Sequence, residues 1–266
     1  MEIKMNKGIV FFDFDGTLVD ETKKIFRPTE TTLESIERLK ENGYLTVLAT
    51  GRAKCYVPKT GIEWDGYITS NGAHAELLGK TVYDRFMPWR LVKRMIDKAD
   101  DFGYIYVLEN QELCYTNGLE NANFVKTLST FDIPDSTFRP FSEADEPPVH
   151  KMFLTFERME AYEAVTREFE GEMVFGMHRT SMSCDADMAG TSKGIGIGRL
   201  AEAAGVGIES TYAFGDSVND YEMLKNVGTG IAMGDHVPSL ENVCSFVTET
   251  VEHEGITVGL AKAGLL

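Results

Sequence analysis

A short apolar run that stops abruptly at two carboxylates constrains this chain more than any other feature of its sequence. Ile9–Phe12 contains only β-branched and aromatic residues, a composition typical of a strand buried on both faces. Asp13 and Asp15 follow it, and their side chains point the same way because alternate residues of an extended chain share a face. Two acids in one place repel each other unless a cation or a reacting group lies between them. Gly16 has no Cβ, so the chain can turn sharply there or let a ligand approach.

Apolar runs that end in small polar residues recur along the chain. A capping box that starts at Thr31 predicts an amphipathic helix, and the second run, Leu45–Ala49, stops at Thr50. Strand, helix and strand with short connections predict a βαβ unit, and hence a parallel sheet with right-handed crossovers. A helix over Lys193–Ala204 and a strand over Tyr212–Phe214 resume the pattern near the C-terminus. We therefore expect an α/β fold with a Rossmann-like parallel-sheet core.

The middle of the chain has a different character. Within residues 83–187 we predict a helix at about 89–102 and several short strands, together with a Pro- and acid-rich connection over 134–148. This segment holds 11 basic and 20 acidic side chains, so it carries more than half of the formal net charge of -16. We expect residues 1–82 and 188–266 to form the α/β core, and 83–187 to form an inserted α+β domain.

The overall composition excludes several classes of function. The net charge of -16 argues against nucleic-acid polymers and anionic membrane surfaces as partners. The four cysteines are dispersed and form no C-x-x-C pair, so neither a zinc site nor a disulfide framework is indicated. The N-terminal apolar run is too short for a signal peptide, and no stretch approaches transmembrane length. These features predict a protein of the reducing cytoplasm.

In an open α/β sheet, ligands bind beyond the carboxyl ends of the strands, and three of the apolar runs end in polar clusters. These clusters contain Asp13 and Asp15, Thr50, and the group Asp216, Asn219 and Asp220. A parallel sheet would bring all three clusters to one edge, although they are far apart in sequence.

Each cluster also has a purely structural alternative. Thr50-Gly51-Arg52 could be a plain turn between strand and helix, and Lys193 could be a solvated surface lysine. Against the second alternative, Lys193 lies at a helix start, where the macrodipole disfavours a cation unless an anion compensates it. Gly215-Asp216 could be a turn, and Ser70-Asn71-Gly72 is interpreted as a structural turn rather than a ligand contact.

Taken together and in order, the clusters resemble the four motifs of the haloacid dehalogenase-like (HAD) hydrolase superfamily. The first motif, D-x-D-x-T, is matched by Asp13-Phe14-Asp15-Gly16-Thr17, and the second by Thr50. The third is matched by Lys193 and the fourth, G-D-x-x-N-D, by Gly215–Asp220. The Ser-Asn-Gly-Ala string, the Ser-Lys-Gly string and the inserted segment resemble the Cof-type subfamily, with its type IIB cap. Ser217-Val218 departs from the small or glycine residues that many family members carry there.

The resemblance assigns a chemical role to each motif. It implies that Asp13 is a nucleophile that becomes an aspartyl-phosphate and that Asp15 is the general acid and base. The hydroxyl of Thr50 would bond the transferring phosphoryl group, and the amine of Lys193 would neutralise both nucleophile and phosphate. Further phosphate contacts are expected from Gly51 and Asn219. Mg²⁺ would be held by four acidic residues, with Asp15 contributing its backbone carbonyl: Asp13, Asp15, Asp216 and Asp220.

We therefore predict a Mg²⁺-dependent phosphatase that acts on a small phosphorylated metabolite, either a sugar phosphate or a phosphorylated cofactor. Residues 83–187 would be the cap domain that chooses the substrate. One alternative is a phosphomannomutase-like phosphomutase, which the acidic cap disfavours because a bisphosphate needs basic contacts. Another is a non-catalytic sensor of phosphorylated ligands, which would not need to retain Asp15. Dehalogenase chemistry is disfavoured because family members that perform it lack the second Asp of the first motif.

Overall fold

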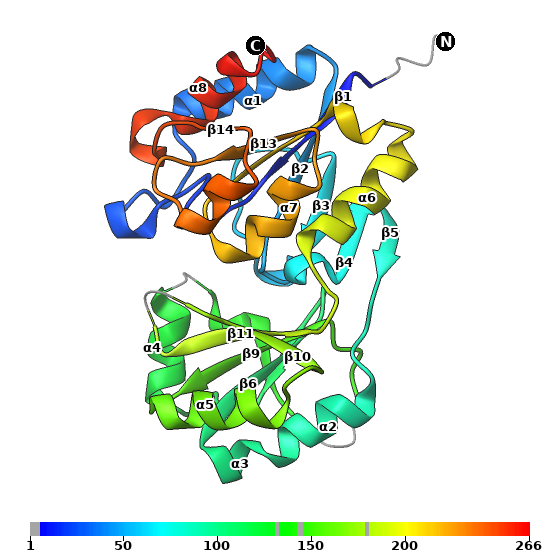
Figure 1. Ribbon diagram of the computed structural model, residues 1–266. Helices are drawn as coiled ribbons and strands as arrows, with labels where there is room; N and C mark the ends of the chain where they lie inside the picture. The colour runs from blue at the N-terminus through cyan, green and yellow to red at the C-terminus, as the bar shows by residue number, and fades with distance from the viewer. Residues whose placement is uncertain (1–5, 131–132, 143–145, 179–180) are drawn as a thin grey trace. The chain divides into compact units, whose positions relative to one another are not determined.

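The computed structural model describes residues 6–130, 133–142, 146–178 and 181–266, and the chain divides into two compact units (Figure 1). The first unit contains Met1–Thr50, Pro58–Tyr83 and Ser192–Leu266. The second contains Gly51–Val57 and Asp84–Thr191. The core and cap predicted from the sequence divide at residues 82/83 and 187/188. The short segment Gly51–Val57, however, is predicted from the sequence to belong with the core.

The first unit is built on an eight-stranded sheet in the order β14-β13-β12-β1-β2-β3-β4-β5. The run from β14 to β3 is parallel, as predicted, and β4 adds to β3 in the antiparallel direction. The strands are β1 (Gly8–Phe12), β2 (Tyr44–Ala49), β3 (Gly66–Thr69), β4 (His74–Leu77), β5 (Lys80–Asp84), β12 (Thr211–Gly215), β13 (Thr229–Ala232) and β14 (Phe246–Val247).

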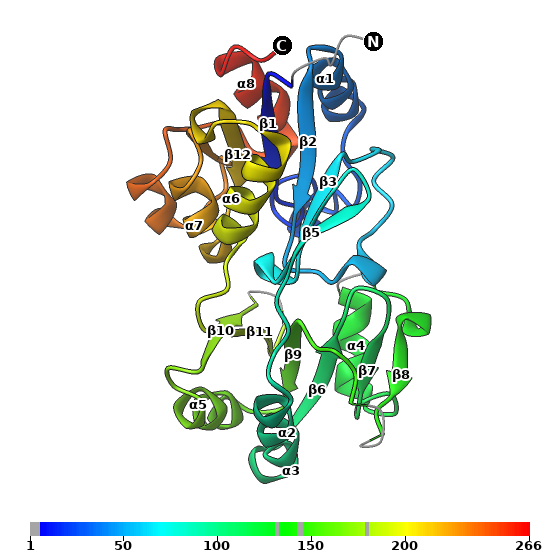
Figure 2. The same ribbon diagram turned by 90° about the vertical axis from the view of Figure 1, so that its right-hand side faces the viewer.

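Helices cover both faces of this sheet. Helix α1 (Glu30–Glu41) packs with α8 (Gly255–Lys262), and α6 (Lys193–Ala204) packs with α7 (Tyr221–Lys225) on the opposite face (Figures 1 and 2). The predicted start of the first helix at Thr31 is wrong. Thr29 is the N-cap, because its backbone is extended and its side chain accepts a hydrogen bond from the Thr32 N–H at 3.1 Å.

The alternation of side chains along β1 explains why the strand is apolar throughout. Ile9 and Phe11 belong to a buried cluster with Ile197 and Leu200 of α6. Phe12 points to the other face, where its ring stacks on Phe214 with a centroid distance of 5.4 Å. Because both faces are buried, only apolar residues are tolerated until the strand ends, and the first carboxylate marks that end. Among the described residues, no helix combines the length and apolarity needed to cross a membrane.

The second unit has its own six-stranded sheet, in the order β10-β11-β9-β6-β7-β8. Neighbouring strands are antiparallel except for β7 and β8, which run parallel. Strand β8 lies inside segment 134–148, which the sequence analysis predicted to be a connection without a strand. The Pro and charged residues of this segment are atypical of strands, so the sequence pattern did not predict it. The strands are β6 (Tyr104–Glu109), β7 (Cys114–Thr116), β8 (Phe138–Pro140), β9 (Lys151–Phe156), β10 (Met173–Met177) and β11 (Ser183–Met188).

Alternate residues of β9 pack into different clusters on the two faces of this sheet. Met152 and Leu154 contact the cluster formed by α2 (Trp89–Asp97), α3 (Ala99–Phe102) and α5 (Met159–Glu168), whereas Phe153 belongs to another. The helix predicted over 89–102 is therefore two helices. The second cluster contains residues of α4 (Ala122–Thr130) together with Ala53 and Tyr56. Tyr56 and Ala53 are buried there, which explains why Gly51–Val57 belongs to the second unit.

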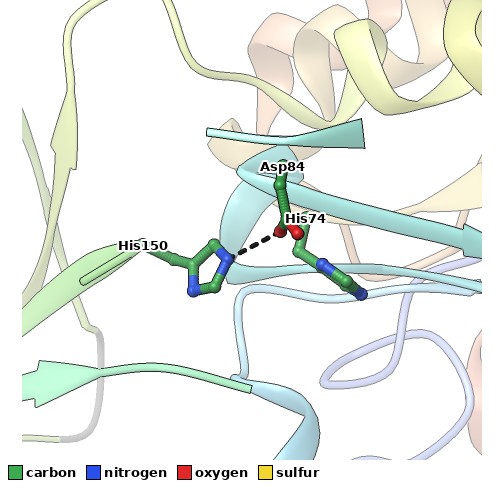
Figure 3. A group of neighbouring side chains, drawn as sticks. All are labelled: His74, Asp84 and His150. Atoms are coloured by element: carbon green, nitrogen blue, oxygen red, sulfur yellow. Dashed lines mark hydrogen bonds and ion pairs between the residues drawn. The ribbon is translucent and has the colours of Figure 1, made fainter. Parts of the chain in front are cut away.

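A polar pair lies within the second unit, at the point where the chain returns to that unit at Asp84. His150 Nε2 lies 2.8 Å from Asp84 Oδ1, and Figure 3 shows the two side chains facing each other. The Phe86 ring packs on the His150 ring, with a centroid distance of 4.5 Å. These contacts hold Asp84 and Phe86 against the residue that precedes β9.

Candidate active site

The carboxyl ends of β12, β1 and β2 place three of the predicted motifs side by side. Phe12 is in register with both Leu48 and Phe214, so the residues that follow these strands emerge at the same level of the sheet. The backbone N–H of Asp13 donates to the Phe214 carbonyl at 3.0 Å, which continues the ladder by one residue. Thr50 is 1% exposed at the end of β2.

Lys193 is fully buried and joins the third motif to the first and the fourth. Its Nζ lies 2.5 Å from Asp13 Oδ1 and 2.7 Å from Asp220 Oδ1. Lys193 is the first residue of α6, where the macrodipole disfavours a cation, and the two carboxylates offset this cost. The surface-lysine alternative therefore does not apply.

Asp220 uses both of its carboxylate oxygens inside the protein. While Oδ1 accepts the Lys193 ammonium, Oδ2 accepts the backbone N–H groups of Asp216 and Ser217, each at 3.0 Å. Ser217 and Asp220 complete a capping box around the 3₁₀ turn Val218–Asp220. Asp220 thus fixes the backbone of the loop that carries Asp216.

Asp216 approaches the first motif from the neighbouring strand. Its Oδ1 accepts a hydrogen bond from the Thr17 hydroxyl at 3.2 Å. Gly16 adopts φ +89°, and a Cβ on it would lie 2.4 Å from Asp216 Oδ2. Only glycine therefore permits this close approach. Asp15 is partly exposed and forms an isolated parallel bridge with Val19, which closes a tight turn after the strand.

Burial dominates the electrostatics of Asp13. Loss of solvent, reinforced by the negative charge of Asp220, raises the pKa of Asp13 from 3.8 to about 7, although Lys193 partly opposes the shift. A further cation beside Asp13 would lower this pKa. The site as built from protein atoms alone therefore has more negative than positive charge to accommodate.

The residues present fit a divalent metal ion with hard oxygen ligands. Carboxylate oxygens of Asp13, Asp216 and Asp220 all lie within 4.8 Å of one another. Mg²⁺ prefers one or two carboxylates and several waters, and a cation there would offset the charge that burial makes costly on Asp13. Asp13 and Asp216 would supply the carboxylates. Both carboxylate oxygens of Asp220 already accept hydrogen bonds, one from Lys193 and the other from backbone N–H groups.

The turn Ser70-Asn71-Gly72 comes closer to the predicted site than the sequence suggested. All three residues have positive φ, at 49°, 51° and 95°. Asn71 Oδ1 accepts the Asn219 side-chain amide at 3.1 Å, and its backbone N–H donates to the Thr50 carbonyl at 3.2 Å. The sequence analysis interpreted this string as a structural turn. Two successive residues other than glycine in the left-handed conformation are unusual, however, and such backbone often occurs at functional sites.

One predicted phosphate contact lies outside the first unit. Gly51 follows Thr50 directly but is the first residue of the second unit. Its carbonyl accepts a hydrogen bond from Lys151 Nζ at 2.7 Å.

Comparison with known proteins gives the chain its family. The sequence profile of the haloacid dehalogenase-like hydrolases matches residues 10–260. The chain belongs to this family. YkrA of Bacillus subtilis (strain 168) is 30% identical over 98% of this chain and 100% of its own length. The pyridoxal phosphate phosphatase YbhA of Escherichia coli (strain K12) is 26% identical over 87% of this chain and 89% of its own.

A solved structure shares the complete architecture of this family member. The HAD subclass IIB sugar phosphatase BT4131 superposes with a TM-score of 0.85 and 25% identity, covering 97% of this chain and 100% of the other. The predicted family and fold class, a Rossmann-like core with an α+β cap domain, are therefore confirmed.

Proposed function

We propose that this HAD-like hydrolase uses Mg²⁺ to hydrolyse a small phosphorylated metabolite through a covalent phosphate on Asp13. The coarser statement, that it is a phosphatase acting on phosphoric monoesters of small metabolites, follows from its family and from relatives that are phosphatases over almost its full length. A sugar phosphate and a phosphorylated cofactor are the two substrate classes that these relatives represent.

The observation that carries the proposal is the buried ion pair between Asp13 and Lys193. A carboxylate that must attack phosphorus has to be ionised and fixed in place, and the ammonium at 2.5 Å supports both. The same ammonium would offset charge on the equatorial oxygens of the phosphoryl group, together with the Thr50 hydroxyl. Mg²⁺, held by Asp13 and Asp216, would supply further neutralisation of that charge when bound.

The proposed reaction has two steps. Asp13 attacks phosphorus, the ester oxygen leaves, and Asp15 gives that oxygen its proton. Asp15 then takes a proton from water, which attacks the phosphorus of the aspartyl-phosphate and regenerates Asp13. Asp220 does not react in this scheme, since it holds Lys193 and the loop of Asp216 in position.

The second unit is proposed to be the cap that selects the substrate. It contributes none of the four motifs, and residues 83–187, which make up most of it, carry more than half of the formal net charge of -16. A phosphoenzyme also needs controlled access to water, which a separate domain supplies in many enzymes.

The test is phosphate release from p-nitrophenyl phosphate and from a panel of about a hundred phosphorylated metabolites, with Mg²⁺ and with EDTA. We expect turnover only with the metal and one class of substrate strongly preferred. Incorporation of label from a ³²P-labelled substrate into the protein, and its absence in Asp13→Asn, would locate the intermediate. Absence of phosphate release from every substrate, by a folded protein supplied with Mg²⁺, would refute the proposed function and favour a sensor.

A further inference from the structure

A buried lysine of the second unit lies outside the four motifs, yet it holds the residue that follows Thr50. Lys151, the first residue of β9, is 1% exposed. Its Nζ donates to the Gly51 carbonyl at 2.7 Å and to Asp185 Oδ1 at 2.5 Å, and it lies 3.4 Å from Glu109 Oε2. The ammonium thus makes two hydrogen bonds and lies close to a second carboxylate.

The sheet register explains why these charges meet. Lys151 is paired with Glu109 across β9 and β6, and both side chains lie on the face that carries Phe153. Asp185 of β11 is in register with Phe153, so its carboxylate shares that face. Gly51–Val57 packs on the same face. The Tyr56 hydroxyl donates to Glu109 Oε1 at 2.5 Å.

Lys151 and Asp185 keep their charges although both are buried. Burial opposes the charge of Lys151, but Asp185 and Glu109 outweigh it and raise the pKa of the ammonium above its ordinary value. Burial likewise opposes the charge of Asp185, but Lys151 and His178 lower the pKa of that carboxyl below its usual range. The hydrogen bond to the Gly51 carbonyl is therefore made by a charged ammonium, and such bonds are about twice as strong as neutral ones.

Each residue of the Thr50–Gly51 peptide is held by hydrogen bonds within its own unit. Within the first unit, the Thr50 N–H donates to the Ile68 carbonyl at 2.8 Å, and the Thr50 carbonyl accepts the Asn71 N–H at 3.2 Å. Within the second unit, Lys151 holds the Gly51 carbonyl. Glycine has the widest choice of backbone torsions. Without the bond from Lys151, the backbone of Gly51 would be less constrained in the turn that carries Thr50 and Gly51, two of the predicted phosphate contacts.

We propose that Lys151 is a positioning residue for phosphoryl transfer, which acts by fixing the Thr50–Gly51 turn. The proposal rests on the proposed function, because it takes Thr50 and Gly51 as phosphate contacts. The ammonium of Lys151 is bonded to the Gly51 carbonyl and to Asp185, so we assign it no contact with the substrate.

The test compares Lys151→Met with Asp185→Asn at pH 7.5. Both changes unbalance the same buried charges, but only the first removes the bond to Gly51. We expect Lys151→Met to lower kcat for p-nitrophenyl phosphate about tenfold with a change in KM of about twofold, since misplacing a catalytic turn costs mainly transition-state binding. Asp185→Asn should stay within about threefold of the wild type. Equal losses in both variants would reduce Lys151 to a structural counter-ion and overturn the proposal.

A double-mutant cycle with Thr50→Val shows whether Lys151 acts through the turn. We expect the Lys151→Met penalty on kcat to shrink from about tenfold to about threefold or less in the Thr50→Val background, because coupled residues are non-additive. If Lys151→Met lowers kcat by the same factor in the wild-type and Thr50→Val backgrounds, Lys151 does not act through this turn. Should Lys151→Met not fold, the charge-balanced Lys151→Met/Asp185→Asn variant replaces it in the cycle.

Amide hydrogen exchange provides a readout that does not depend on activity. Residues 51–57 should exchange faster in Lys151→Met than in Asp185→Asn, while α1 exchanges at the same rate in both. Unchanged exchange over 51–57 would show that Lys151 does not restrain this segment. If the wild type lacks phosphatase activity but this exchange difference is present, the proposed function fails while the restraint on the turn remains. The catalytic role of Lys151 would fail with that function.

Discussion

Replacing Asp13 by Asn should make the metal-free protein more stable while it abolishes turnover. Asn has the shape of the protonated carboxyl group but cannot ionise. Asp13 is 4% exposed, the carboxylate of Asp220 lies nearby, and a single ammonium, that of Lys193, is shared by the two carboxylates. When no metal is present, ionised Asp13 therefore destabilises the fold, and Asn removes this destabilising charge.

The size and sign of the effect follow from the pKa of Asp13, which is 3.8 ordinarily and about 7 in the folded chain. Below pH 3.8 both folded and unfolded states carry the proton, and Asp and Asn are equivalent. As the pH rises towards 7, the unfolded state loses its proton first, so the free energy of unfolding of the wild type falls. Three pKa units at about 1.4 kcal/mol each give a total of about 4 kcal/mol, most of it already lost at pH 6.

The assay is urea denaturation of the wild type and Asp13→Asn in EDTA, from pH 6 to pH 8.5, above the sequence pI of about 4.8. We expect Asn to exceed the wild type in unfolding free energy by about 3 kcal/mol at pH 6 and by about 4 kcal/mol at pH 8. Glu109, whose pKa burial also raises to about 7, is the same in both proteins and cancels from the difference. Mg²⁺ should then stabilise the wild type more than the variant.

Asp185→Asn is the matched control with the opposite sign. Its carboxyl has a pKa held below the usual range, so its ionised form stabilises the fold above pH 3.8 and the variant should be less stable at pH 8. The reasoning about Asp13 fails if Asp13→Asn is less stable than the wild type at pH 8 in EDTA. It also fails if the difference does not widen from pH 6 to pH 8.

Three further outcomes are expected. Asp15→Asn should slow hydrolysis of an alkyl phosphate by at least about a hundredfold but formation of the phosphoenzyme from p-nitrophenyl phosphate much less, because a good leaving group needs little acid; equally small losses in stopped-flow assays of both substrates would contradict its role. Lys193→Met should cost about 3–5 kcal/mol in urea unfolding at pH 8, since it leaves two buried acids without their cation; the loss should shrink at pH 6, and a loss independent of pH would argue against this cause. Gly16→Ala should weaken Mg²⁺ binding at least about tenfold by calorimetry, because a Cβ at φ +89° would meet Asp216, whereas Gly61→Ala, with φ +82° and open space around it, should bind Mg²⁺ as the wild type does.

The local sequence pattern is sufficient to predict the sheet of the first unit. Apolar runs such as Ile9–Phe12 can only be buried on both faces, and parallel strands then bring their carboxyl ends to one edge. The spacing of the motifs along the chain therefore predicts by itself that Asp13, Thr50 and Asp216 lie together. The shortness of the run and its β-branched and aromatic composition are therefore enough to predict the strand.

Only the tertiary structure determined how the side chains around this edge are arranged. The carboxylate of Asp220 accepts hydrogen bonds from Lys193 and from two backbone N–H groups. This arrangement depends on the geometry of a turn, which the spacing of residues in the sequence does not reveal. The assignment of Gly51–Val57 to the second unit depends on contacts with Lys151 and Glu109, which lie at least 50 residues away in the chain. Sequence patterns report the periodicity of one element, whereas a buried charge is explained only by partners from other elements, and these meet only when the chain has folded.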